Sequence, residues 1–302
     1  MRKWAWFSLA LLILSAFPPE AAANTLWTTL IPADARWVIH IDVARLAETR
    51  IKALLYEDSG GGIGRAVKEM EAAGKINLLR DMSGVTIIGL GPEEKDTVVV
   101  FEGKVDREYL LSLIKLEKST REIPYGKFTL YNWGSAEYGV FASDNLTLIG
   151  GNARTIQAVL DAWEGKGRAA TGSPLLGKLA SVSPGAFMVA STNNISALTR
   201  DKESSAILRK AGAAVLHLGE EKGIVKIRLV LDTDSAETAS NLTKIVDGLI
   251  AMQAMGGEKP PRGIDFLKDL KISREGSVIQ AILETAVENL SRRPFSFIRL
   301  PF

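Results

Sequence analysis

The hydrophobic pattern of the first half of the chain switches repeatedly between alternation and helical spacing. Alternating segments rich in β-branched and aromatic residues predict strands over residues 37–43, 85–90, 97–101, 128–133, 138–141 and 146–149. Helical spacing follows Asp42, Asp106 and Asn152, residue types that cap a first turn. The last of these helices is expected to end at Gly165.

The second half shows a similar succession. Strands are predicted over residues 186–190, 213–218, 225–231, 270–272 and 278–283, with a helical stretch around 195–211. Asp234 and Glu237 have the spacing of a capping box, which predicts that a helix begins here. The helical spacing predicts that this helix buries one apolar face, formed by Leu242, Ile245, Val246, Leu249 and Ile250.

The two halves correspond in their order of elements. Pro32 and Pro184 each precede a first strand, residues 103–106 match 231–234, and residues 144–148 match 275–279. This order predicts an α+β fold of two ferredoxin-like β-α-β-β-α-β-β-α repeats, with antiparallel sheets packed by helices. The repeats are expected over residues 24–168 and 169–291, followed by a C-terminal tail over residues 292–302.

The first 23 residues have the pattern of a secretory signal peptide. Arg2 and Lys3 precede an apolar run over residues 4–17, and three alanines at residues 21–23 offer a cleavage site. An uncleaved anchor is the alternative, although the apolar run is short for a membrane span. We expect a periplasmic or extracellular protein with no integral membrane span after cleavage.

Composition narrows the classes of function. With 46% hydrophobic and 24% charged residues, the 302-residue chain has the balance of a globular protein. It contains no cysteine, which excludes disulfides, thiol catalysis and thiolate metal sites, and fits a bacterial envelope better than a eukaryotic secretory pathway. A net charge of +2 predicts no nucleic-acid partner.

Five residues form a candidate functional surface. His40 and Asp42 share one face of a predicted strand, where they could bind a metal or act as a base. Tyr131, Trp133 and Tyr138 could form an aromatic platform for a sugar or peptide, with ordinary cross-strand packing as the alternative. His217 lies in the other predicted repeat, so we do not expect the two histidines to share a metal site. The sequence predicts no cofactor, and we assign no catalytic residue.

Two further motifs are incomplete. Ser112 and Lys115, together with Ser143-Asp144-Asn145, imitate part of the penicillin-recognising serine set, but no Lys-Thr-Gly follows. The latter triplet favours a tight turn. The glycine run over residues 60–64 follows a predicted helix rather than a strand, unlike a dinucleotide fingerprint.

Residues 31–43, 138–150 and 156–167 resemble a family of exported bacterial proteins found in planctomycete-like and acidobacterium-like genomes. The resemblance implies export and a repeated α+β build, and it carries no catalytic residues. We therefore expect an exported envelope protein that acts as a non-catalytic binding or interaction module, with a protein or envelope polymer as partner. The alternative is a hydrolase that depends on carboxylates or on His40.

Overall fold

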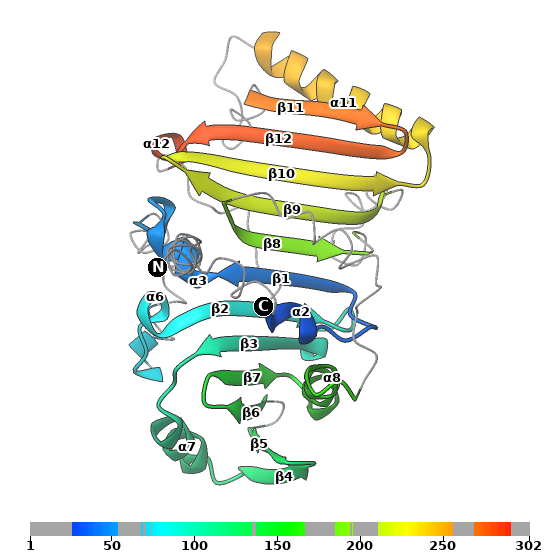
Figure 1. The fold of residues 1–302 in the computed structure, drawn as a ribbon. Helices are drawn as coiled ribbons and strands as arrows, with labels where there is room; N and C mark the ends of the chain where they lie inside the picture. Colours follow the sequence, from blue (N-terminus) through cyan, green and yellow to red (C-terminus); the bar gives the residue numbers. More distant parts are fainter. Residues whose placement is uncertain are drawn as a thin grey trace, which may run out of the picture.

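The computed structural model describes residues 26–53, 68, 71–72, 74–134, 137–166, 185–193, 195, 211–255 and 269–290. The signal peptide, the tail, the glycine run and nearly all of the helix expected around 195–211 lie outside these residues. The described part is dominated by one twelve-stranded sheet with the order β11-β12-β10-β9-β8-β1-β2-β3-β7-β6-β5-β4 (Figure 1).

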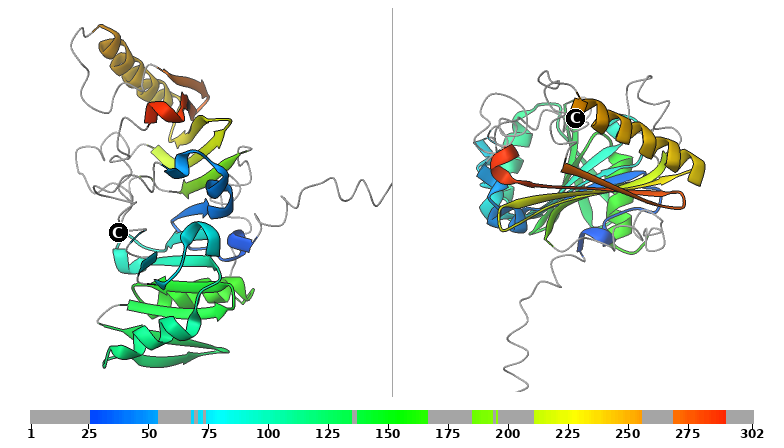
Figure 2. Two further views of the ribbon diagram at one scale, coloured as in Figure 1. Left: turned by 90° about the vertical axis from the view of Figure 1, so that its left-hand side faces the viewer. Right: turned by 90° about the horizontal axis from the view of Figure 1, so that it is seen from above.

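The strands are β1 (Trp37–Asp42), β2 (Met82–Gly89), β3 (Thr97–Gly103), β4 (Arg121–Tyr125), β5 (Phe128–Trp133), β6 (Glu137–Ser143), β7 (Leu146–Gly150), β8 (Ala186–Thr192), β9 (Ala211–Glu221), β10 (Ile224–Thr233), β11 (Leu270–Glu275) and β12 (Val278–Ala286). The helices are α2 (Leu26–Thr29), α3 (Val43–Glu48), α6 (Leu78–Asp81), α7 (Arg107–Leu116), α8 (Ala153–Trp163), α11 (Ala236–Met255) and α12 (Val287–Leu290), with a 3-10 turn η1 (Glu94–Asp96). Strand follows strand along the molecule, with α11 at one end and α7 and β4 at the other (Figures 1 and 2).

The prediction of two ferredoxin-like repeats is wrong. In a ferredoxin-like unit, a helix carries the chain from one strand to another two places away in the sheet, with a third strand between them. Here β1 pairs directly with β2 and β8 pairs directly with β9, and the twelve described strands form one antiparallel sheet rather than two. Tight turns join several of the neighbouring strands. Lys222 and Gly223, with φ of 53° and 82°, reverse the chain between β9 and β10 in the left-handed conformation that suits a hairpin.

The sheet is continuous across the predicted boundary between the repeats, because β1 pairs with both β2 and β8. From this central pair the strand order runs outward in the same way on both sides, as β1-β2-β3-β7-β6 and as β8-β9-β10-β12-β11. Helix α7 follows β3 in the chain as α11 follows β10. The two halves therefore share an order of elements within one sheet, and β4 and β5 extend the first half.

Two hydrophobic clusters pack on opposite faces of the sheet, since strand residues alternate between faces. The larger cluster lies under α8, which Asn152 caps by accepting a hydrogen bond from the Thr155 amide at 2.9 Å, as predicted. Its fully buried members include Val38, Ile88, Val98, Leu148, Ile156, Val159 and Leu160. The smaller cluster joins α3, α12 and the strands between them through Leu46, Ile51, Phe187, Leu218, Val225 and Val287.

Helix α11 differs from its prediction in two respects. The Ser235 hydroxyl, rather than Asp234, accepts a hydrogen bond from the Thr238 amide at 3.1 Å and caps the first turn. The expected apolar face is only partly covered, and Ile245 is 46% exposed. The helix packs mainly against three strands at the end of the sheet, β10, β11 and β12, which explains this incomplete burial.

Candidate functional site

His40 lies inside the sheet rather than on a surface. It is 6% exposed, and its Nδ1 atom is 2.9 Å from the Thr86 hydroxyl oxygen on β2. The Thr86 hydroxyl in turn donates a hydrogen bond to Glu102 Oε1 on β3, at 3.3 Å. A chain of hydrogen bonds therefore crosses three neighbouring strands, and we name His40, Thr86 and Glu102 the buried polar row.

Strand register explains how these side chains meet. His40 is the cross-strand partner of Thr86, while Asp42 pairs with Gly84, and Gly84 pairs with Glu102. A Cβ atom at residue 84 would lie 3.2 Å from His40 Cε1 and 3.4 Å from the Glu102 carboxyl group. The glycine thus leaves room for both side chains to approach one another above it.

Burial sets the charge state of the row. It lowers the pKa of His40 from 6.5 to about 4, so the ring is neutral at pH 7. Burial also raises the pKa of Glu102; the hydrogen bond from Thr86 opposes this shift and the charge of Asp42 adds to it. Since the Thr86 hydroxyl donates to Glu102, it accepts from His40, which assigns the ring proton to Nδ1.

Asp42 has a structural task of its own. Its carboxylate accepts a hydrogen bond from the Arg45 amide at 2.9 Å and caps α3, as predicted. The Arg45 side chain lies 3.7 Å from the same carboxylate. Asp42 therefore contributes to the local fold and to the electrostatics of Glu102.

The two histidines are nearer than their sequence separation suggested. Both His40 and His217 are cross-strand partners of Val189 on β8, so they occupy one row two strands apart, about 10 Å. Burial lowers the pKa of His217, and the charge of Arg228 lowers it further. Among the described residues, no group of three or more His, Asp or Glu side chains is arranged to hold a metal ion.

The three aromatic residues do not form one platform. Tyr131 pairs with Gly139, whereas Tyr138 pairs with Asn132, so alternation directs Tyr131 and Trp133 to one face and Tyr138 to the other. Tyr138 packs against the larger hydrophobic cluster. Tyr131 is 7% exposed and contacts Phe141 edge to face, with ring centroids 6.3 Å apart. Cross-strand packing, the alternative expected above, describes these residues.

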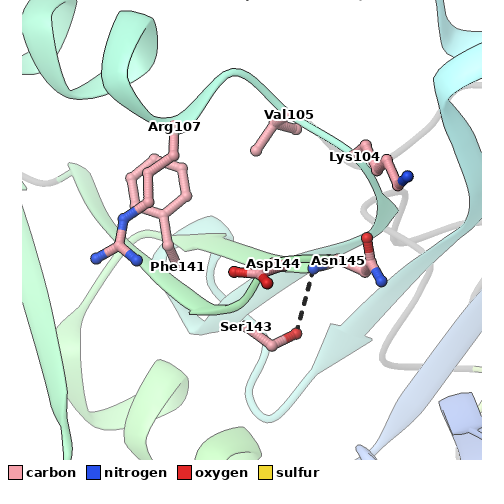
Figure 3. A pocket seen from close by; sticks show the side chains of 7 residues that line it. All are labelled: Lys104, Val105, Arg107, Phe141, Ser143, Asp144 and Asn145. Atoms are coloured by element: carbon pink, nitrogen blue, oxygen red, sulfur yellow. Dashed lines mark hydrogen bonds between the residues drawn. The ribbon is translucent and has the colours of Figure 1, made fainter.

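A shallow pocket lies where the loop after β3 meets the β6–β7 turn, and we name it the turn pocket (Figure 3). It has a volume of about 270 Å³ and is lined by Lys104, Val105, Arg107, Phe141, Ser143, Asp144 and Asn145. The Gly103 amide donates to the Asn145 carbonyl oxygen at 2.9 Å, which joins its two walls. The Asn145 amide donates to the Ser143 hydroxyl at 3.3 Å and shapes the turn.

The side chains of the turn pocket divide into apolar walls and a charged rim. Val105 and Phe141 are half-buried, while the five polar lining residues are exposed. The Arg107 guanidinium lies 5.4 Å from the centre of the Phe141 ring. Lys104 and Asn145 lie at the opposite end of the pocket from this pair, and the Asp144 carboxylate lies between the two ends (Figure 3).

Sequence reasoning missed most of both sites. Thr86 and Glu102 occupy inward positions of strands, and the alternation of Val98 and Val100 continues to Glu102. The sequence predicts a strand that ends at residue 101, one position before this buried carboxylate. The turn at residues 143–145 was predicted correctly, but its proximity to Arg107 depends on strand pairing. Ser112, from the incomplete serine motif, donates its hydroxyl hydrogen bond to the Tyr109 carbonyl oxygen on α7.

The fold and the two sites define a single antiparallel sheet that carries a buried polar row and a charged, shallow surface pocket. No family model matches the chain, and a search of curated proteins finds no match. Solved structures of TP0453 share the fold at low sequence identity. Crystal form III aligns with a TM-score of 0.52 and 12% identity, covering 88% of this chain and 96% of that chain. Crystal form I gives a TM-score of 0.51 and 11% identity, over 90% and 97%.

None of the helices in the described ranges combines the length and the hydropathy that crossing a membrane requires.

Proposed function

We propose that this chain is a non-catalytic binding module of the bacterial cell envelope, which meets an envelope protein or polymer through exposed side chains. The positive, apolar and small-residue regions of residues 1–23 support export. The lack of cysteine in a chain of 302 residues fits a bacterial envelope. The likeness to TP0453 concerns the fold alone.

The environment of His40 carries the non-catalytic part of the proposal. A general base must come within hydrogen-bonding reach of its substrate. The His40 ring is 6% exposed and is hydrogen-bonded to Thr86 within the sheet. Asp42, the carboxylate nearest to it along β1, caps α3. Both groups are therefore engaged in holding the fold.

The first experiment tests export. The complete chain, with its own N-terminal residues, is expressed in a bacterial host and followed by fractionation and intact mass. We expect a periplasmic or secreted species that begins at Asn24. Full-length chain confined to the cytoplasm would contradict the proposal.

The second experiment tests binding against catalysis. Protein recovered from the envelope is examined by native mass spectrometry and by co-sedimentation with purified envelope fractions, including isolated sacculi. We expect association that the His40→Asn variant retains. Turnover of an ester, amide or glycoside substrate that His40→Asn abolishes would instead favour the hydrolase.

A further inference from the structure

The turn pocket combines positive charge with apolar surface. Lys104 and Arg107 line it together with one carboxylate, that of Asp144, so the lining is net positive. Within the described part of the chain, neither Lys104 nor Arg107 is joined to a carboxylate in an ion pair. A ligand carboxylate that reaches Arg107 beside the apolar wall of Phe141 would be attracted more strongly than in open water.

The remaining groups suit a ring of hydroxyls. The Lys104 ammonium group donates hydrogen bonds, the Asn145 amide both donates and accepts, and the Ser143 hydroxyl can do the same. Val105 and Phe141 offer apolar walls for the C–H face of such a ring. A volume of about 270 Å³ is small for a ligand pocket and matches a single sugar ring better than an extended ligand.

Strand pairing argues against a peptide at this place. An extended peptide commonly binds by adding a strand to an open sheet edge. Both strands that border the β6–β7 turn are paired on each side, since β6 lies between β5 and β7, and β7 lies between β6 and β3. Recognition here must therefore come from side chains.

We propose that the turn pocket binds a pyranose ring bearing a carboxylate, presented by an envelope polysaccharide. This inference rests on the proposed function and names the partner class for it. Arg107 holds the carboxylate, Lys104 and Asn145 bind ring hydroxyls at the opposite end of the pocket, and Val105 and Phe141 contact the apolar face of the sugar.

The test is a titration of the exported, ¹⁵N-labelled protein, followed by amide chemical shifts. Two probes carry the proposed chemistry from different sources: a muramic-acid disaccharide from peptidoglycan and a glucuronic-acid disaccharide. Neutral diacetylchitobiose is the control sugar. We expect saturable shifts at the Gly103 and Asn145 amides with at least one acidic probe, and weaker binding of chitobiose.

Matched variants localise the binding. Arg107→Gln and Lys104→Gln are each expected to weaken the acidic sugar about tenfold, since a hydrogen bond to a charged group is lost. Lys118→Gln makes the same charge change outside the pocket and should leave binding unchanged. Asp144→Asn should preserve or strengthen binding, because it removes a negative charge from the site. Thermal unfolding checks that each variant is folded.

The outcomes separate this inference from the proposed function. The inference is overturned if no acidic probe binds, if chitobiose binds equally well, or if Arg107→Gln binds like the parent. Loss of binding in Asp144→Asn overturns it too, since that result indicates a cationic ligand. If the Arg107→Gln protein still co-sediments with envelope fractions, the binding function survives and this pocket is not its site. If the parent protein associates with no envelope fraction, the proposed function itself fails.

Discussion

Replacing Glu102 with glutamine should expose a steep pH dependence of stability that His40 produces and Glu102 partly conceals. The pKa of His40 falls from 6.5 to about 4 on folding because the ring is buried. Between these values the unfolded chain binds more protons than the folded chain, so acidification destabilises the fold. The shift corresponds to about 3 kcal/mol in full, of which about 2 kcal/mol is lost between pH 7 and pH 5.

Glu102 acts in the opposite direction. Burial raises its pKa in the folded protein, so the folded state takes up a proton more readily than the unfolded state as the pH falls. Its contribution to stability is fully present below the unfolded pKa and is lost as the pH rises through the folded pKa. Acidification therefore relieves a cost at Glu102 while it imposes one at His40, and the stability of the parent protein should change less with pH than His40 alone would dictate.

The assay is urea unfolding followed by circular dichroism at pH 7, 6, 5.5 and 5. We compare Glu102→Gln with the double variant His40→Asn/Glu102→Gln, so that all other titrating groups cancel. The single variant should lose about 2 kcal/mol more than the double variant between pH 7 and pH 5. Parallel pH profiles for the two proteins would refute the assignment of a neutral, buried His40.

Five further substitutions test the packing by urea unfolding at pH 7. Gly103→Ala would place its Cβ atom 2.3 Å from a backbone carbonyl oxygen and should cost about 2 kcal/mol, whereas Gly248→Ala meets open space in α11 and should stabilise by about 0.5–1 kcal/mol; equal effects would contradict this. Asn152→Ala removes the cap of α8 and should cost about 1 kcal/mol, and no loss would show that the cap is dispensable. Leu160→Ala, at a fully buried position, should cost about 2–5 kcal/mol, while Leu116→Ala, at a position 77% exposed, should change stability by less than about 0.5 kcal/mol.

Local signals predicted most of the described elements. Alternation located β1, β5 and β7 within a residue or two, and Asp42, Asp106 and Asn152 cap their helices as expected. These features depend on neighbours a few residues apart in the chain. Strand pairing does not, which is why the same succession of elements was interpreted as two ferredoxin-like units. Ile39 pairs with Ala190 and so makes the sheet continuous, but the alternation within each strand does not indicate which strand will be its neighbour.

The buried polar row was hidden for a related reason. His40 is a residue type that often performs chemistry, and its place on a strand could be predicted. Its hydrogen-bond partner Thr86 lies 46 residues further along the chain, and Glu102, the partner of Thr86, lies another 16 residues on. Gly84 matters because a side chain is missing there, and this has meaning only once β1, β2 and β3 are aligned. Residue spacing along one strand therefore identifies His40, at one end of the buried polar row, but neither of the two hydrogen bonds that form the row.

The edges of the sheet bear on how the protein meets a partner. An open edge invites another strand unless charge, proline or a covering element opposes it. β4 contains Pro124, which has no amide hydrogen to donate, and Arg121 and Glu122 on the same strand are exposed. At the other edge Arg274 donates hydrogen bonds to the carbonyl oxygens of Ala236, in α11, and of Gly276.

With both edges protected in this way, the sheet is suited to holding turns rigidly rather than to adding strands. The turn pocket, fixed between the end of β3 and the β6–β7 turn, is the kind of contact that such a scaffold supports.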